Sequence, residues 1–338
     1  MDLPYLTADL PGTGGVLRAQ PEDFVVDEVP AYPAAGEGDH VFVRFEKRGL
    51  TTQVAVERFA KALAVKPRDI GVAGMKDRHA VTRQWISIPP PIAPEQVQAL
   101  ALDDIAILEV VRHRHKLRTG HVKANQFVLR VRECGDDAVA KATAILDRLV
   151  QPPGTPNWYG EQRFGRDGDN AERGRAIVNG EGFPRDRKLA RFLISSLQSD
   201  LFNRWLTARM ADNLYTTVLA GDVLHKVGGG MFTSEDAATD TARLVAGEVI
   251  LTGPMFGTDM RSPAEGSPSA DREQQILDAA GLSRESFATV RAIAEGTRRD
   301  ATIFVATPAV TAIEGGIEVT FTLPGGAYAT AVMREVMK

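Results

Sequence analysis

A single carboxylate lies inside a run of basic residues in the first quarter of the chain. The segment AGMKDRHAVTRQW, residues 73–85, places Asp77 directly between Lys76 and Arg78, without the apolar period of a buried helix or strand. Neighbouring cations favour the ionised form of a carboxylate, which suits a nucleophile or a base that must stay deprotonated at neutral pH. The alternative is a surface turn with a solvated ion pair, because most charge runs are solvated.

A second charged segment carries one sign only. RHRHKLRTGHVK, residues 112–123, contains five Arg or Lys residues, three His residues and no acid. Arg forks and Lys point charges bind phosphate oxygens, so this basic stripe predicts a nucleic-acid contact. The alternative is a strand edge that charge protects from pairing. A metal site at the three histidines is disfavoured, because no Cys or carboxylate cluster lies nearby.

A third segment combines aromatic rings with polar side chains. NWYGEQRFG, residues 157–165, contains two adjacent aromatics, an amide and an arginine. Aromatic rings stack on unpaired bases, and amides read base edges. The alternative is a domain hinge whose rings pack on both sides, and the two interpretations are compatible. The glycine runs at 12–15 and 228–230 lack the strand-loop-helix context of a phosphate loop and are interpreted as turns.

The first 150 residues, which hold the first two segments, are predicted to mix strands and helices. Alternating apolar residues predict a strand over 40–49, and Phe127, Leu129 and Val131 share one face of a predicted strand over 125–134. A further strand is predicted over 104–111, and helices over 51–65 and 136–150. This order indicates an α+β fold rather than a strict βα repeat.

A proline-rich stretch at 151–165 marks a boundary, after which helical periodicity dominates. A long helix is predicted over 188–210, and shorter ones over 234–248, 270–281 and 283–296, while LAGDVLHKVGGGMF (219–232) interrupts them as a predicted strand and turn. Alternation returns in TIFVAT (302–307) and IEVTFTL (317–323), before a final helix within 324–337. We therefore expect an α+β domain with a helical insertion, whose C-terminal strands rejoin the first sheet.

Composition limits the class of protein. The 338 residues are 43% hydrophobic and 25% charged, as in ordinary globular proteins. The only cysteine, Cys134, allows no intramolecular disulfide, which suits a reducing compartment. No apolar run reaches membrane-span length and the first residues lack a secretory-signal pattern, so a cytoplasmic location is expected. The net charge of −4 argues mildly against a polyanion partner, but only the contacting face needs to be positive.

Six separated motifs, in order, make the chain similar to a known family. GMKDRHAVTRQW, RHRHKLRTGHVKANQF and PNWYGEQRFG together resemble the TruD family of tRNA pseudouridine synthases. RAQPEDFVVDEVP (18–30), GEGDHVFVRFEKRGLTT (36–52) and TLPGGAYATAVMREV (322–336) also match its pattern, and the similarity is weakest across 211–300.

The resemblance implies a fold and an activity. The fold is an α+β pseudouridine synthase domain with a mixed sheet, over 1–155 and 304–338, interrupted by a mainly helical insertion over 156–303. The activity is isomerisation of uridine to pseudouridine, in bacterial members usually at position 13 of certain tRNAs. The resemblance implies tRNA as the partner, with no metal, no organic cofactor and no membrane, and nothing in the sequence demands more than a monomer.

The resemblance also assigns roles to residues. The family's catalytic aspartate falls on Asp77, and the aromatic that stacks on the target base falls on Phe127. Further base-pocket positions are Phe24, Asn125 and Tyr159, and supporting positions are Arg18, a candidate partner of Asp77, and Lys76. The order Trp158–Tyr159 departs from the NYFG that is common in bacterial relatives, so either ring could face the base. The basic stripe is expected to follow the RNA backbone through Arg112, Arg114, His115, Lys116, Arg118 and Lys123.

Three other functions are considered. An RNA-binding protein or tRNA-folding chaperone would use the basic stripe and the aromatics but would not depend on Asp77. An N-glycosylase would break the same bond and release free uracil. A methyltransferase would carry a glycine-rich cofactor loop after a strand, and the sequence has no evident one.

Overall fold

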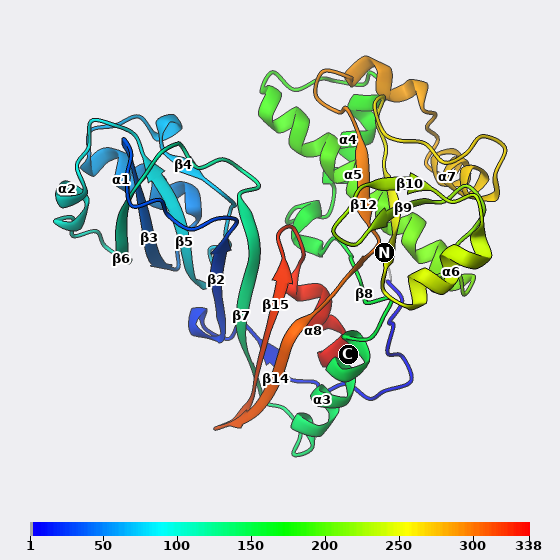
Figure 1. Cartoon of the computed structure of the whole chain (residues 1–338), viewed down its shortest axis with the longest axis horizontal. Coiled ribbons are helices and arrows are strands. Elements are labelled where there is room, and N and C mark those ends of the chain that lie inside the picture. Colours follow the sequence, from blue (N-terminus) through cyan, green and yellow to red (C-terminus); the bar gives the residue numbers. More distant parts are fainter. Residues whose placement is uncertain (1–2) are drawn as a thin grey trace. The chain divides into compact units, whose positions relative to one another are not determined.

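The computed structural model describes residues 3–338 and divides into two compact units. The first, here called the sheet unit, contains residues 10–147, 305–329 and 336–338. The second, here called the α5 unit after its longest helix, contains residues up to 9, 148–304 and 330–335. Each unit is therefore built from segments that are far apart in the sequence (Figure 1).

A nine-stranded mixed sheet forms the sheet unit. Seven strands follow the order β14-β15-β7-β2-β5-β3-β6, while β1 pairs with β7 and β4 with β5. The β2–β5 pairing is parallel and the others are antiparallel. The strands are β1 (Val16–Leu17), β2 (Phe24–Pro30), β3 (His40–Arg48), β4 (Gly71–Val72), β5 (Val81–Ile88), β6 (Ile105–His113), β7 (Val122–Arg132), β14 (Ala306–Ile313) and β15 (Gly316–Pro324).

One core of this unit lies between the sheet and helix α1 (Thr52–Ala62). Thr51 caps α1 by accepting a hydrogen bond from the backbone N–H of Val54. Phe59 on the inner face of α1 meets Phe45 of β3 edge to face, with ring centroids 5.2 Å apart. Short helix α2 (Pro94–Gln98) places Val97 in the same core, while α3 (Ala138–Leu149) and α8 (Ala329–Met337) follow β7 and β15 in the chain.

The register of β7 against its neighbours gathers several predicted site residues on one face. Phe24 of β2 pairs with Leu129, and Glu28 with Asn125, while Phe321 of β15 pairs with Phe127. Side chains two residues apart in a strand point to the same side of a sheet. Phe24, Glu28, Asn125 and Phe127 therefore share a face.

The α5 unit combines helices with a small sheet. Helix α5 (Arg187–Ala211) begins at the N-cap Asp186, whose carboxylate accepts from the backbone N–H of Lys188. A four-stranded antiparallel sheet, β10-β9-β11-β12, adds to the expected helices. The elements are α4 (Asn170–Val178), α6 (Ala237–Val245), α7 (Pro268–Ala279), β8 (Thr155–Pro156), β9 (Val223–Lys226), β10 (Met231–Thr233), β11 (Val249–Met255), β12 (Thr297–Asp300) and β13 (Thr302–Ile303).

Two segments differ from the sequence-based prediction. Residues 283–296 form no α-helix, only a 3-10 helix over Glu285–Val290 followed by single turns. TIFVAT is not one strand, because Thr302–Ile303 pairs with β8 in the α5 unit, whereas β14 begins at Ala306 in the large sheet. The chain passes from one unit to the other after residue 304, and this passage interrupts the strand.

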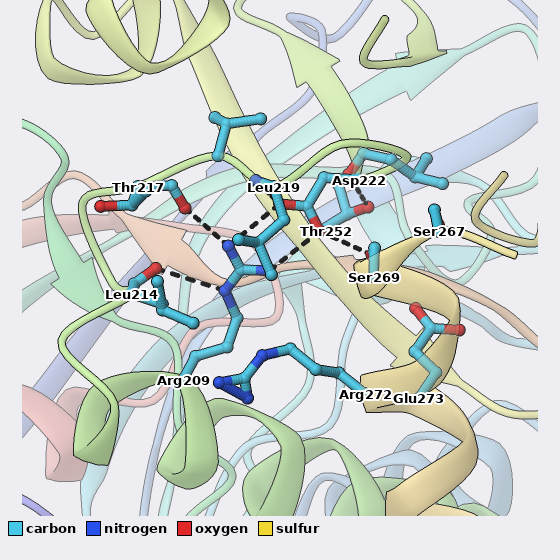
Figure 2. A network of polar contacts seen from close by, with 12 residues as sticks. Arg209, Leu214, Thr217, Leu219, Asp222, Thr252, Ser267, Ser269, Arg272 and Glu273 are labelled. Carbon is cyan, nitrogen blue, oxygen red and sulfur yellow. Dashed lines mark hydrogen bonds and ion pairs between the residues drawn. The ribbon is translucent and has the colours of Figure 1, made fainter. Parts of the chain in front are cut away.

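A buried ion pair joins α5 to the loop before β9 (Figure 2). Arg209 and Asp222 are 1% and 4% exposed, and two nitrogen–oxygen pairs lie 2.9 and 3.0 Å apart. Arg209 also donates to the carbonyl oxygens of Leu214 and Thr217, and Asp222 accepts from Ser269 at the start of α7. The two buried charges therefore compensate each other, and the further hydrogen bonds satisfy both groups, as burial of an ion pair requires.

Two further observations concern the described residues alone. None of their helices is long and apolar enough to cross a bilayer. No group of three or more His, Cys, Asp or Glu among them is arranged to hold a metal ion.

Candidate active site

Asp77 lies in the loop between β4 and β5 and forms an ion pair with Arg18. Its side chain is 44% exposed, and its Oδ2 lies 2.9 Å from Nη2 of Arg18. Arg18 has a φ of 63°, in the left-handed region that non-glycine residues adopt only at a cost. Its guanidinium carbon lies 3.9 Å from the centre of the Phe24 ring. Stacking on Phe24 and pairing with Asp77 together fix the Arg18 side chain.

The cations next to Asp77 in the sequence bind other groups. Lys76 Nζ lies 2.8 Å from Glu28 Oε2 and donates to Asn125 Oδ1 at 2.6 Å. The Arg78 side chain donates to the carbonyl oxygen of Gly49 at 3.3 Å. The adjacent cations therefore do not form the ion pair of Asp77; its partner is Arg18, 59 residues earlier, the candidate that the resemblance indicates. Consecutive side chains of a non-helical chain point in different directions, which explains the difference.

Lys47 holds the backbone of the Asp77 loop and was missed by the sequence analysis. Its fully buried ammonium group donates to the carbonyl oxygens of Asp77, at 2.8 Å, and Leu50, at 2.5 Å. Burial lowers the pKa of Lys47 to about 8; the nearby Asp77 charge opposes this shift and Lys76 adds to it. The signal was present in the sequence, because Lys47 continues the inward series Val41, Val43 and Phe45 of β3.

The lowered pKa of Lys47 predicts an alkaline gain in stability. Between pH 8 and the unfolded value near 10.5, the unfolded chain binds more protons at this residue than the folded chain. The free energy of unfolding should therefore rise with pH in this window, by an amount on the order of 1 kcal/mol between pH 7.5 and 9.5. The measurement is urea unfolding at both pH values, and the rise should be absent from Lys47→Met. Equal pH dependence in both proteins would contradict the assignment.

Aromatic side chains continue from Arg18 across the sheet face. The Phe24 and Phe127 rings meet edge to face with centroids 6.2 Å apart, and Phe127 lies 5.5 Å from Phe321. Phe24, Asn125 and Phe127 are buried, and the amide oxygen of Asn125 accepts from Lys76. The structure thus brings together, in the sheet unit, five sequence-predicted site residues around Asp77: Arg18, Phe24, Lys76, Asn125 and Phe127.

Tyr159 belongs to the α5 unit, where it is buried. Its backbone N–H donates to Asn203 Oδ1 and its carbonyl oxygen accepts from Asn203 Nδ2, both at 3.0 Å. The Arg299 guanidinium carbon lies 4.0 Å from the centre of its ring, and its hydroxyl donates to the Met255 sulfur at 3.6 Å. Trp158 is also buried, at 2% exposure. That one of these two rings faces the target base stays a prediction.

The basic stripe connects the edge strand β6 to β7, and most of its charged side chains are exposed. Those of Arg112, Arg114, His115, Arg118 and Lys123 are exposed and Lys116 is half-buried. Arg114 forms an ion pair with Glu37, and Lys116 donates to the carbonyl oxygen of Arg68. The stripe has no acid in its sequence, but the fold brings Glu37 to Arg114.

The chain matches a known protein family over almost its whole length. The family model described as tRNA pseudouridine synthase D (TruD) matches residues 1–182 and 185–336, which include all of the predicted site residues. The chain belongs to the TruD family. A tRNA pseudouridine synthase D from an Anaeromyxobacter species is 51% identical, with 100% of this chain and 96% of the relative covered. The Thermus thermophilus protein of the same name is 42% identical, with 99% and 92% covered.

A solved structure supports the TruD fold independently of close sequence similarity. The crystal structure of a Methanosarcina mazei protein assigned to TruD matches with a TM-score of 0.77 at 24% identity. The match covers 100% of this chain and 98% of that one. The α+β class with a mixed sheet, predicted from the sequence, is confirmed. Members of the TruD family are named as tRNA pseudouridine synthases, which are isomerases.

Proposed function

We propose that this protein isomerises uridine to pseudouridine in tRNA, with Asp77 as the catalytic residue. The observation that carries the proposal is the half-exposed Asp77 carboxylate, ion-paired to an Arg18 that stacks on Phe24. The guanidinium of Arg18 holds one carboxylate oxygen of Asp77 in place, and the exposed part of that carboxylate is free to meet a ribose. Membership of the TruD family supports the same reaction.

The proposed chemistry exchanges one bond of the ribose for another. The bond from C1′ to N1 of uracil breaks, and N1 keeps the electron pair and takes up a proton. The base turns, and C1′ bonds to C5, whose proton leaves. Asp77 either attacks C1′ and is later displaced, or removes the C2′ proton to give a glycal and later returns it. Both routes need the carboxylate to be held at the sugar, and the Arg18 pair positions it.

The base is proposed to be bound by Phe24, Phe127 and Asn125. The target uridine has to leave its stack to be reached, and an aromatic ring can receive its face. Because the Asn125 amide oxygen already accepts from Lys76, its amide nitrogen is left to donate to a uracil carbonyl oxygen. Phe127 cannot take a proton, so the C5 proton must leave to water or to another group.

The tRNA is proposed to be bound by both domains. A catalytic domain over 1–155 and 304–338 would supply Asp77 and the basic stripe, and an insertion domain over 156–303 would supply Tyr159. Position 13 is the proposed target, by resemblance to the bacterial members of the family. The proposed form is a cytoplasmic monomer.

Within the basic stripe, Arg118 is expected to matter more than Arg114. Arg118→Gln should weaken tRNA binding and lower the slope of log K against log salt concentration by about 0.7–0.9, because one phosphate contact is lost. Arg114→Gln is the matched control, since Glu37 already compensates that charge. Fluorescence anisotropy of labelled tRNA between 50 and about 300 mM salt measures both slopes. Identical slopes for wild type and Arg118→Gln would remove this residue from the contact.

Chemical mapping of pseudouridine tests the proposed substrate and position. Unmodified tRNA transcripts are incubated with the protein and read by reverse transcription after carbodiimide treatment. A new stop at position 13, absent from transcripts carrying cytidine there, supports the proposal. Bound tRNA without any stop would favour the RNA-binding alternative, and release of free uracil would indicate a glycosylase.

A further inference from the structure

The α5 unit exposes an aromatic and basic surface that the catalytic proposal leaves unused. The segment GFPRDRKLARF, residues 182–192, forms the loop before α5 and its first two turns. Phe183 and Phe192 are 56% and 42% exposed. No other Phe, Tyr or Trp among the described residues is exposed. Because large rings are normally buried, two of them exposed nine positions apart indicate a binding surface.

The same surface carries uncompensated positive charge. Arg185, Arg187, Lys188 and Arg191 are exposed, and none of them forms an ion pair with a described residue. The single acid of the segment, Asp186, is used as the helix cap. By contrast, three other exposed arginines of this unit each pair with an acid: Arg173 with Asp169, Arg175 with Glu172 and Arg204 with Asp200.

Two arginines connect this surface to other parts of the unit, namely the Tyr159 ring and a hollow beside α5. Arg163 lies over the Phe192 ring at 5.7 Å and over the Tyr159 ring at 5.6 Å, and its guanidinium donates to Ser195. On the other side, Arg191 lines a hollow of about 230 Å³ together with Gln198, Met255 and residues 293–297. Arg163 and Arg191 therefore connect the exposed rings and cations to the Tyr159 ring and to a hollow whose lining is mixed, with Met255, Ile293 and the acid Glu295 among its residues.

We propose that this surface binds an unpaired segment of the tRNA. The name α5 surface is used below for its residues, which are Phe183, Arg185, Arg187, Lys188, Arg191 and Phe192. Every base has a face that stacks on an aromatic ring, and the free cations complement the phosphates between stacked bases. A double-stranded segment would use the cations but not the rings. The inference rests on the proposed function for the identity of the RNA, and it assigns a contact to the α5 unit alone.

Two matched variants of the full-length protein separate a local contact from general electrostatics. The test variant is Arg187→Gln/Lys188→Gln/Arg191→Gln, and the control is Arg173→Gln/Arg175→Gln/Arg204→Gln, which removes the same charge from the same unit. The test variant should bind unmodified tRNA transcripts about ten-fold or more weakly, with a salt slope lower by up to about 2. The control should bind within about two-fold of wild type. Melting temperatures check that both variants fold.

The rings are tested separately. Phe183→Ala/Phe192→Ala should weaken binding to tRNA and to a single-stranded oligouridine by about ten-fold or more, with little change in salt slope. Binding to a blunt RNA duplex should not change. Equal loss in both triple variants, unchanged binding in the test variants, or a shift in self-association without a shift in tRNA affinity would each overturn the inference. Wild-type protein that binds tRNA through the α5 surface but forms no pseudouridine would support it while contradicting the proposed function.

Discussion

Pseudouridine formation by the Asp77→Asn variant is expected to fall by at least about 10⁴-fold in kcat, the scale on which loss of an essential catalytic group acts. Asn keeps the size of the side chain but can neither attack C1′ nor accept a proton from C2′. The ion pair with Arg18 at 2.9 Å can be replaced by a hydrogen bond from the charged guanidinium to the amide oxygen of Asn, so the geometry should change little. The measurement is single-turnover conversion of a tRNA transcript with the enzyme in excess.

A matched aspartate on the same sheet distinguishes chemistry from charge. Asp27 of β2 is paired with Arg44 at 2.6 Å and lies on the face opposite to Phe24. Asp27→Asn should keep kcat within about three-fold of wild type, and both variants should bind tRNA. Substantial activity in Asp77→Asn, or an equal loss in both variants, would remove Asp77 from the centre of the reaction.

The Arg209→Met variant is expected to lose about 3–5 kcal/mol of unfolding free energy in the α5 unit, the second large effect. The substitution leaves Asp222 as a buried carboxylate without its bidentate partner, and it frees the carbonyl oxygens of Leu214 and Thr217 (Figure 2). The hydrogen bonds that Asp222 accepts from Leu219 and Ser269 do not replace a full positive charge. Urea unfolding followed by tryptophan fluorescence measures the loss, because Trp205 packs against Arg209.

Two companion variants show that burial, not the ion pair itself, sets this cost. Arg204 lies on the same helix and pairs with Asp200, but it is 43% exposed, so Arg204→Met should cost less than about 1 kcal/mol. Adding Asp222→Asn to Arg209→Met should restore part of the stability, since it removes the uncompensated charge. Similar losses in Arg204→Met and Arg209→Met would contradict this account.

Periodicity predicted the elements that bury one face. The alternation in His40–Arg48 and Val122–Arg132, and the helical spacing in Arg187–Ala211, are confirmed as β3, β7 and α5. Periodicity did not predict strands whose formation depends on pairing with other strands. β5 lies between β2 and β3 and is almost wholly buried, so its sequence does not alternate. In the small sheet of the α5 unit, β9 and β10 overlap the strand and turn predicted over 219–232, whereas β11 and β12, of seven and four residues, were not predicted because short strands give weak local signals.

The sequence and its family resemblance indicated residues that the fold brings together around Asp77, including Arg18 as a candidate partner, but not how the other charges pair. The sequence indicated Asp77 because it lies among cations. In the folded chain, however, Lys76 pairs with Glu28, and Arg18 pairs with the Asp77 carboxylate. Lys47 supports the loop from a strand whose inward positions were known, but its charge made it look like a surface residue. Local order in the sequence identifies candidates, and long-range pairing decides which charges meet.

Release of tritium from tRNA labelled at uridine C5 tests the central claim most directly. The new bond from C1′ to C5 displaces one hydrogen from C5 for each pseudouridine that is formed. We expect tritium release by the wild-type protein and none above background by Asp77→Asn. No release from a broad pool of unmodified tRNA by folded wild-type protein, or equal release by both proteins, would contradict pseudouridine formation through Asp77.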